Sequence, residues 1–230
     1  MLSCQGPPDK RKCDGSGLGA HQIGANMGFY QDQIVPLLIN LSMRQKNLTA
    51  YRSRVVPAAE GRVLEIGIGS GLNLPFYSSN ARQVIGLDPS AMLLAMARRS
   101  SRAASRYVEF IEGSAEKIPL DSGSFDTVVT TWTLCSIPAA PKALREMHRV
   151  LKPGGRLLFV EHGRAPESNA QWWQDRLTPI WKRLGGGCLL NRAISSLIED
   201  AGFQFERLET GYMRGPKPMT FMYEGSARPR

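Results

Sequence analysis

Three glycines at alternate positions follow a short apolar run, and they give this sequence its strongest sign of chemistry. Residues 63–72 read Val-Leu-Glu-Ile-Gly-Ile-Gly-Ser-Gly-Leu, so a predicted strand enters a turn at Gly67, Gly69 and Gly71. Glycine has no Cβ, which lets the backbone turn tightly and approach a ligand closely. Because open α/β sheets bind ligands at the carboxyl ends of their strands, we expect this turn to form part of a binding site.

Spacing and charge indicate which ligand the turn would hold. A dinucleotide site has Gly-x-Gly-x-x-Gly and receives a pyrophosphate at a helix N-terminus. This chain has Gly-x-Gly-x-Gly, and Glu65 just before it would repel a pyrophosphate but suits the ammonium group of a methionine moiety. Asp88 ends the second predicted strand, 17 positions after Gly71, where it can accept both hydroxyls of a ribose. Residues 113–116 follow the third strand and are expected beside an adenine ring.

Together with the turn Leu-Lys-Pro-Gly-Gly at 151–155, these residues resemble the class I S-adenosylmethionine-dependent methyltransferases, particularly the subgroup of ubiquinone/menaquinone C-methyltransferases. The resemblance covers about residues 61–162. It implies S-adenosylmethionine as the cofactor and a seven-stranded sheet with its last strand antiparallel. The expected cofactor site comprises Glu65, Gly67, Gly69, Gly71, Asp88, Pro89, Met92, Ser114, Ala115 and Thr131. Ser114 departs from the pattern, because many relatives have there an Asp that meets the adenine amino group.

Four further segments carry side chains that could shape an acceptor pocket. They are Thr-Trp-Thr-Leu-Cys-Ser-Ile at 131–137, Val-Glu-His-Gly-Arg at 160–164, Trp-Trp at 172–173, and Trp-Lys-Arg-Leu-Gly-Gly-Gly-Cys-Leu-Leu-Asn-Arg at 181–192. Three patterns in them resemble the alkyl-thiol S-methyltransferases: Thr-Leu-Cys-Ser, the Glu-His after the fifth strand, and a Trp followed by Gly-Cys-x-Leu-x-Arg. Those are methyltransferase-like enzymes of animal endoplasmic reticulum and lipid droplets with bacterial relatives. The resemblance implies methyl transfer to the sulfur of a small thiol or sulfide, such as hydrogen sulfide or methanethiol. The N-terminus departs from the animal proteins, which carry a hydrophobic membrane anchor there.

The candidates for catalysis each have a functional and a structural interpretation. His162 could take the thiol proton, since imidazole titrates near neutrality, or could be a structural hydrogen-bonding group at a strand end. Glu161 could orient His162, act as the base itself, or pair with an arginine. Arg192 could hold an anionic acceptor or cap the preceding loop. The catalytic candidates are therefore His162, Glu161 and Arg192.

A thiol acceptor would need a small apolar pocket beside the positively charged sulfonium. A thiol has a pKa of roughly 8.5, so a small shift or a nearby base generates the nucleophilic thiolate. Thiolate and sulfonium attract each other more strongly in a dry site. Ordinary packing competes with this interpretation for the tryptophans, and it is favoured for Cys135 and Cys188. The expected pocket residues are Tyr30, Trp132, Cys135, Trp172 and Trp181.

The elements that must position these residues alternate between short β-rich runs and helical stretches from residue 61 onward, which predicts an α/β, Rossmann-like fold. We expect a seven-stranded, mostly parallel sheet with helices on both faces. The predicted strands are 62–66, 83–87, 107–112, 125–130, 156–161, 203–208 and 219–223, and the predicted helices are 90–102, 141–151, 168–184 and 191–201. Residues 1–25 are expected to be a disordered tail, 26–57 an N-terminal helical cap, and 58–230 the methyltransferase domain.

The bulk composition bounds the remaining classes of function. The 230 residues carry a net charge of +9 that is spread along the chain, so no nucleic-acid partner is expected. No signal peptide is expected, and no segment reaches the roughly 20 apolar residues that span a bilayer. The helix at 34–41 could lie on a membrane surface or simply cover the core or the site. We therefore expect a cytoplasmic protein, with peripheral membrane contact as the alternative. The four cysteines lack metal-ligand spacing and no Cys/His cluster accompanies them, so no metal is expected.

Three rival functions remain beside thiol methylation. A phosphatidylethanolamine N-methyltransferase or a quinone C-methyltransferase would act at a membrane surface, and the basic N-terminal helix supports these two. A binding protein that keeps the cofactor fold without catalysis is disfavoured by the intact Glu65, glycines and Asp88. Nucleic-acid methylation comes last, because the Asn-Pro-Pro-Tyr-type motif of some base methyltransferases is absent after the fourth strand.

Overall fold

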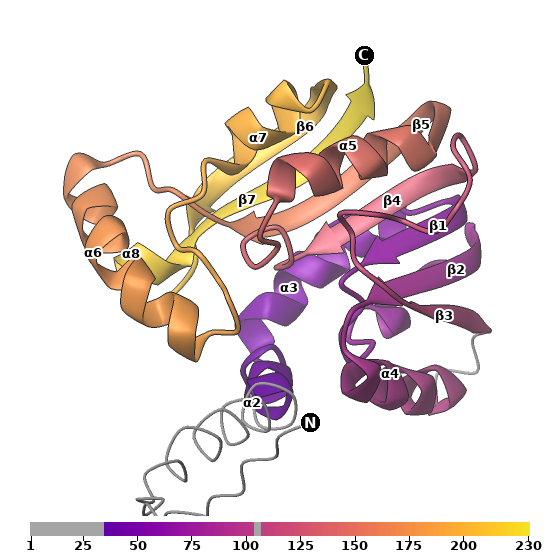
Figure 1. Cartoon of the computed structure of the whole chain (residues 1–230), viewed down its shortest axis with the longest axis horizontal. Helices are drawn as coiled ribbons and strands as arrows, with labels where there is room; N and C mark the ends of the chain where they lie inside the picture. The colour runs from indigo at the N-terminus through magenta and orange to yellow at the C-terminus, as the bar shows by residue number, and fades with distance from the viewer. Residues whose placement is uncertain (1–34, 104–106) are drawn as a thin grey trace, which may run out of the picture.

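A seven-stranded sheet forms the centre of the computed structural model, which describes residues 35–103 and 107–230 (Figure 1). The strands run in the order β3-β2-β1-β4-β5-β7-β6. Their bounds are β1 (Gly61–Ile66), β2 (Ala81–Asp88), β3 (Val108–Glu112), β4 (Phe125–Thr131), β5 (Leu151–His162), β6 (Phe203–Tyr212) and β7 (Phe221–Pro229). Strands β1 to β5 pair in parallel, whereas β7 runs antiparallel to both β5 and β6. The predicted mostly parallel sheet with an antiparallel last strand is confirmed.

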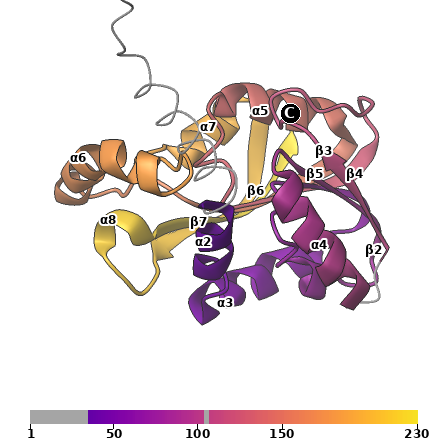
Figure 2. The same ribbon diagram turned by 60° about the horizontal axis from the view of Figure 1, so that its bottom comes forward.

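Helices cover both faces of this sheet, as the alternating pattern predicts. Helices α5 and α7 lie on one face, and α3 and α4 lie on the other (Figure 2). The helices are α2 (Val35–Ser42), α3 (Lys46–Val55), α4 (Ala91–Ala103), α5 (Ala140–Val150), α6 (Ser168–Leu184), α7 (Ile194–Asp200) and α8 (Lys217–Thr220), with 3-10 turns η2 (Val56–Ala58) and η3 (Leu74–Phe76). Among the described helices, none combines the length and the apolar composition needed to cross a bilayer.

Two predicted boundaries are corrected. The last strand starts two residues later than predicted, at Phe221, because Lys217–Thr220 forms the short helix α8. Pro218 lies in the first turn of α8. Proline fixes φ near the helical value and has no N–H for a strand ladder, so it suits a helix start better than a sheet. The helix predicted at 191–201 begins only at Ile194, since Arg192 and Ala193 are still part of the preceding loop.

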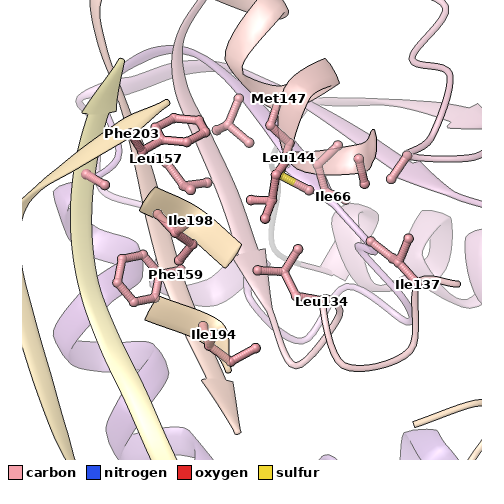
Figure 3. Close-up of a cluster of buried hydrophobic side chains, with 14 of the residues drawn as sticks. Ile66, Leu134, Ile137, Leu144, Met147, Leu157, Phe159, Ile194, Ile198 and Phe203 are labelled. Atoms are coloured by element: carbon pink, nitrogen blue, oxygen red, sulfur yellow. The ribbon is translucent and has the colours of Figure 1, made fainter. Parts of the chain in front are cut away.

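The core on the α5 side of the sheet also fixes a loop beside the carboxyl edge. The buried positions of α5 recur at helical spacing and pack Leu144 and Met147 against Leu157 of β5 (Figure 3). Leu134 and Ile137 belong to the loop after β4, and their side chains enter the same cluster. Burying a large aliphatic side chain stabilises the fold by about 1.5–3 kcal/mol, so this loop is held by core packing rather than left free.

The carboxyl ends of the parallel strands meet at one edge of the sheet, where β1, β2, β4 and β5 end in Ile66, Asp88, Thr131 and His162. Helices α2 and α3 lie in the chain range predicted for the N-terminal cap, and they are separated at residues 43–45. The predicted tail, residues 1–25, lies outside the described residues.

The packing of Leu134 yields a stability prediction. Leu134→Ala should lower the free energy of unfolding by about 2–5 kcal/mol, because it leaves a cavity in a fully buried cluster. Urea denaturation would measure the loss. Leu184→Ala is the matched control: its side chain is 59% exposed, so the change should stay within about 0.5 kcal/mol. Equal effects of the two substitutions would contradict the packing described here.

Candidate active site

A cavity of about 420 Å³ lies at the carboxyl edge of the sheet. Most of the residues predicted to hold the cofactor line it, namely Glu65, Gly67, Gly69, Asp88, Pro89, Ser114, Ala115 and Thr131. The N-terminal helices add Pro36, Ile39, Asn40, Met43 and Arg52, and the loop after β4 adds Trp132, Thr133, Ser136, Ile137 and Pro138. The cavity is therefore enclosed by the glycine turn, the ends of β2 to β4 and the N-terminal helices.

The glycine turn is fixed by two different constraints. Gly67 has φ +67°, and a Cβ there would lie 2.4 Å from the side chain of Thr133 in the loop after β4. Gly69 has φ +55°, but the nearest atom to a Cβ would be 3.9 Å away, so the space beside it is open. L side chains rarely adopt such φ values. Gly67 thus permits two loops to touch, and Gly69 leaves room for a ligand next to the backbone.

Asp88 joins this turn to the end of β2. Its Oδ2 accepts a hydrogen bond from the Gly69 N–H at 2.9 Å, and its Oδ1 accepts one from the Ser90 N–H at 2.9 Å. Burial raises the pKa of Asp88, while these two hydrogen bonds lower it. Each carboxylate oxygen can accept a further hydrogen bond. The arrangement fits the predicted recognition of two ribose hydroxyls.

Glu65 lies at the base of the cavity in a buried polar network. Asn73 Nδ2 donates to its Oε1 and Tyr77 Oη donates to its Oε2, both at 2.8 Å. Burial raises the pKa of Glu65 to about 7, against the lowering effect of Tyr77, Asn73 and the charge of Arg52. The carboxyl group therefore titrates near neutral pH, where a nearby cation would favour its ionised form.

Arg52 of α3 extends this network to the cap. Its Nε donates to Asn73 Oδ1 at 3.1 Å, its Nη1 donates to the Met43 carbonyl at 3.0 Å, and its guanidinium carbon is 4.8 Å from the Trp132 ring centroid. Burial lowers the pKa of Arg52 to about 10, so it stays charged at neutral pH. Sequence reasoning missed Arg52 and Asn73. Arg52 looks there like one more basic residue on a solvated helix face, although Asn73 could have been noticed two positions after the glycine turn.

Trp132 has a strained backbone next to the cavity. Among the described residues it is the only one other than glycine with a positive φ, at +50°. Such a conformation is costly for a bulky side chain and persists where the surroundings impose it. The Trp132 N–H donates to the Val160 carbonyl at 2.7 Å, and its ring meets that of Tyr51 edge-on. The strain directs an indole into the cavity wall, as the sequence predicts.

Glu161 holds the turn that follows Trp132. Its Oε1 accepts hydrogen bonds from Thr130 Oγ1 at 3.0 Å, the Thr133 N–H at 3.0 Å and the Leu134 N–H at 3.1 Å. Its Oε2 is buried and has no hydrogen-bond partner among the described residues. Burial raises the pKa of Glu161 to about 8. These contacts make it a positioning residue for the loop after β4, and the described hydrogen bonds do not link it to His162.

His162 lies beside two cysteine sulfurs. Its Nε2 is 3.0 Å from Cys188 Sγ, and one ligand atom from each of Cys135, His162 and Cys188 falls within 4.8 Å of the others. The expectation that no Cys/His cluster accompanies the cysteines is wrong. The three residues are far apart in the sequence, and the ends of β4, β5 and α6 bring them together. A hydrogen bond from Cys188 and the charge of His162 lower the pKa of the Cys135 thiol, and the Cys135 thiolate in turn raises the pKa of His162 against the effect of burial.

Three other acceptor-side candidates, Cys135, Trp172 and Trp181, do not line the cavity. Trp181 Nε1 donates to Cys188 Sγ at 3.3 Å, so Trp181 and Cys135 belong to the cluster behind the cavity wall. Trp172 was expected in the pocket, and this is wrong: it is 47% exposed on α6. The buried stripe of α6 is Ala170, Gln174 and Thr178, and helical spacing turns position 172 away from it. Tyr30 lies outside the described residues.

Three more candidates, Arg192, Gly71 and Met92, do not line the cavity. Arg192 Nη1 donates to the Leu134 carbonyl at 2.7 Å and Nη2 to the Pro138 carbonyl at 3.4 Å, so its side chain caps the loop after β4 and not, as the structural interpretation expected, the loop that precedes Arg192. Gly71 does not line the cavity, because it packs where a Cβ would lie 2.9 Å from the Leu74 side chain. On α4 the residue that lines the cavity is Leu93 and not its neighbour Met92.

Fold and cavity together define a class of enzyme. A sequence family described as "Methyltransferase domain" matches residues 64–159. The crystal structure of the [4+2]-cyclase SpnF superposes with a TM-score of 0.63 at 21% identity, covering 79% of this chain and 80% of that one, which shows the shared fold alone. The chain is an S-adenosylmethionine-dependent methyltransferase, and S-adenosylmethionine is its cofactor. The buried acid Glu65, the acceptor pair of Asp88 and the open space beside Gly69 fit that group.

Curated relatives narrow the class. Thiol S-methyltransferase TMT1B of Homo sapiens is 36% identical over 173 residues, which cover 73% of this chain and 69% of the relative. Thiol S-methyltransferase TMT1A of Homo sapiens is 35% identical over 158 residues, which cover 66% of this chain and 64% of the relative. The chain belongs to the same methyltransferase family as these two proteins.

The contacts of Asp88 lead to a binding prediction. Asp88→Asn should weaken binding of S-adenosylhomocysteine on the order of 10–100-fold, since hydrogen bonds to a charged acceptor contribute about 1.5–3 kcal/mol. Isothermal titration calorimetry measures this directly. Asp121→Asn, an exposed aspartate away from the cavity, is the matched control and should leave the affinity unchanged. An unaltered affinity in a folded Asp88→Asn protein would remove Asp88 from the cofactor site.

The raised pKa of Glu65 leads to a pH prediction. Its folded pKa of about 7 lies above the ordinary value of 4.5, so Glu65 is protonated below pH 7 and ionisation costs the apoprotein stability. The ammonium group of the cofactor should stabilise the ionised form. Affinity for S-adenosylhomocysteine should therefore rise between about pH 5.5 and 7.5, and binding near pH 6 should release protons.

The control for this pH effect is a second pair of variants. Glu65→Gln should bind more weakly at pH 7.5 and lose most of the pH dependence, leaving only the residual slope that Asp88 contributes at lower pH. Glu109→Gln, an exposed carboxyl on β3, should keep the wild-type profile. Calorimetry in buffers of different ionisation enthalpy counts the protons. If the affinity of the wild-type chain for S-adenosylhomocysteine does not change with pH, Glu65 is excluded as the partner of the ammonium group.

Proposed function

We propose that the chain methylates the sulfur of a small thiol or sulfide, such as hydrogen sulfide, methanethiol or another alkyl or aryl thiol. One observation carries the proposal. The side chains on which the likeness to thiol methyltransferases rests are scattered over residues 131–192, yet they gather next to the cofactor cavity. Cys135, Cys188 and Trp181 share one cluster, His162 touches it, and Arg192 supports the loop that contains Cys135.

The wall between this cluster and the cavity is thin. Ser136 lines the cavity while its Oγ lies 3.5 Å from Cys135 Sγ, and Gly186 lines the cavity two residues before Cys188. Ile137 and Pro138 make the neighbouring wall apolar. A small sulfur compound needs few hydrogen bonds and fits such a wall, whereas a large polar acceptor would leave its groups unpaired.

The cofactor supplies an electrophilic methyl group on a positively charged sulfonium. The chain's own residues would bind its nucleoside through Asp88 and its ammonium group through Glu65. Trp132 of the loop after β4 and Arg52 of α3 are in contact in the cavity wall, where they would reduce the access of water to the acceptor. An anionic sulfur acceptor is attracted to the sulfonium in this dry surrounding, and both charges disappear on transfer.

A second candidate function has its own supporting observation. Helix α2 lines the cavity with Pro36, Ile39 and Asn40, but its other face leaves Leu41 70% exposed, together with Leu37 and Leu38. An apolar face at the mouth of a cavity suits contact with a membrane surface. The acceptor would then be the amine of phosphatidylethanolamine or the ring of a quinone, drawn from the bilayer.

Methyl-labelled cofactor distinguishes the two functions. The full chain should form volatile labelled product from hydrogen sulfide or methanethiol, or labelled thioether from an aromatic thiol. No label should enter phosphatidylethanolamine vesicles or a demethylated quinone. Label that appears only in the lipid fraction would reject the thiol proposal.

A surface variant serves as the control for this assay. The triple substitution Leu37→Ser, Leu38→Ser and Leu41→Ser changes exposed side chains that do not line the cavity. It should leave the rate with soluble thiols unchanged. Loss of lipid labelling in this variant would instead make α2 the route by which a membrane substrate reaches the site.

A further inference from the structure

We propose that Cys135, His162 and Cys188 bind one zinc ion, and that its open fourth coordination position receives the sulfur of the methyl acceptor. The metal site stands on the geometry of these three side chains. The role of the fourth position rests on the proposed function.

The three side chains are spaced as zinc ligands. Their ligand atoms lie within 4.8 Å of one another, and His162 Nε2 is already 3.0 Å from Cys188 Sγ. Tetrahedral zinc, with Zn–S near 2.3 Å and Zn–N near 2.0–2.1 Å, places such atoms about 3.6–3.8 Å apart. Movements of side-chain rotamers, without a change in the fold, would bring the three atoms to these separations.

Three separate segments, each held by hydrogen bonds, carry the ligands. Cys135 lies in the turn fixed by Glu161 from one side and by Arg192 from the other. His162 is the last residue of β5, where the ladder pairs it with Met222 of β7. The Leu189 N–H next to Cys188 donates to the Cys135 carbonyl at 2.9 Å, so the two cysteine loops are joined. A site prepared in this way loses little freedom when the ion binds.

The donor set is that of a zinc site with an exchangeable ligand. Two cysteines and one histidine give three protein ligands, and in zinc enzymes a set of three leaves the fourth position for water or substrate. Two thiolates neutralise the charge of Zn²⁺, which suits a place where Cys135 is only 2% and Cys188 only 9% exposed. Trp181 Nε1 also donates to Cys188 Sγ at 3.3 Å, and such outer contacts orient thiolate ligands.

Alternative roles explain the cluster less well. Cysteines that merely fill the core need apolar neighbours, which Leu177, Leu190 and Met219 supply, but they need no imidazole at 3.0 Å. A disulfide between Cys135 and Cys188 would consume both sulfurs and leave His162 without its thiol partner. Zinc engages all three groups at once.

The position of the cluster connects it to methyl transfer. Ser136 and Gly186, each within two residues of a proposed ligand, line the cofactor cavity. A thiol or hydrogen sulfide that binds zinc there gives up its proton to solvent and stays as a thiolate. The thiolate sulfur forms a bond to the methyl carbon as the bond from that carbon to the sulfonium breaks, and the electron pair of that bond remains on the cofactor's sulfur. The products are S-adenosylhomocysteine and a neutral sulfur compound, which is a thioether when the acceptor is a thiol and methanethiol when it is hydrogen sulfide. Because the neutral product is a weaker ligand than an anionic sulfur, it can leave.

Metal content is the first test. The full chain, reduced, exposed to zinc and dialysed, should retain one zinc per molecule by elemental analysis. Cys188→Ser and His162→Ala should each lower that content at least tenfold. The matched controls should retain it: Cys4→Ser with Cys13→Ser, the two cysteines outside the described residues, and His148→Gln, the described histidine that lies away from the cluster.

Cobalt substitution is the second test, and its readout is independent of activity. Co²⁺ in the wild-type chain should give the intense visible bands of tetrahedral coordination and a thiolate-to-metal charge-transfer band. Sulfide or ethanethiol should change both bands by taking the fourth position. Wild-type protein that shows neither stoichiometric zinc nor tetrahedral cobalt overturns the proposal, and it does so even if a variant fails to fold.

The tests separate failure of this inference from failure of the proposed function. Thiol methylation that persists at full rate after the bound metal is removed by a chelator would overturn the role of the fourth position and leave the thiol function standing. A second outcome would reject both the thiol function and the role of the fourth position. In it the chain binds zinc, the cobalt spectrum does not change when thiols are added, and the methyl label appears only in lipid. Affinity for S-adenosylhomocysteine should be unchanged in Cys188→Ser and His162→Ala, since neither residue lines the cavity.

Discussion

The arrangement of the site depends on one buried carboxyl group, that of Glu161. Three donors from β4 and the turn after it converge on a single oxygen of Glu161, and this fixes a loop that otherwise has little regular structure. Thr133 in that loop is the residue against which Gly67 closes, so the loop also sets the position of the cofactor turn. The same turn sets the positions of Trp132 on one side and Cys135 on the other. Cofactor contact, cavity wall and sulfur cluster therefore share one support.

The cap is joined to this support by charge as well as by packing. Glu65, Asn73 and Arg52 form a chain of hydrogen bonds from the base of the cavity to α3, and Asn73 also donates to Thr131 at the end of β4. Burying charged groups is costly unless they are paired and hydrogen-bonded. Here the hydrogen bonds through Asn73 and the charge of Arg52 offset that cost only in part, because the pKa of Glu65 is still raised to about 7. The network makes the closed cap sensitive to the charge of Glu65. Binding of a cation beside Glu65 should accordingly tighten the cap, which links cofactor binding to enclosure of the acceptor.

Local patterns in the sequence were enough to predict the sheet and the cofactor turn. Strand periodicity around residues 62–66 and 83–87 and the glycine spacing each concern neighbours in the chain, so the information is local. The cluster of Cys135, His162 and Cys188 could not be predicted in this way, because its members meet only through the order of β4 and β5 and the return of the loop after α6. The prediction that Trp172 lines the pocket was wrong for a related reason. The sequence alone allows the tryptophan pair to form a pocket wall, and only the buried stripe of α6 shows that Trp172 faces outward.

Charge balance distinguishes a thiolate acceptor from a neutral amine in such a site. With two thiolates and the proposed Zn²⁺ the cluster would be neutral, and a bound thiolate acceptor would bring one negative charge that the nearby sulfonium compensates. A neutral amine acceptor would instead take over the positive charge of the sulfonium, so one cation would stay in a buried place near Arg192, which already holds the loop there. A soft ion with thiolate ligands also binds sulfur in preference to hard oxygen donors. Electrostatics and ligand softness thus both favour a sulfur acceptor. That preference would be lost only if water reached the cluster.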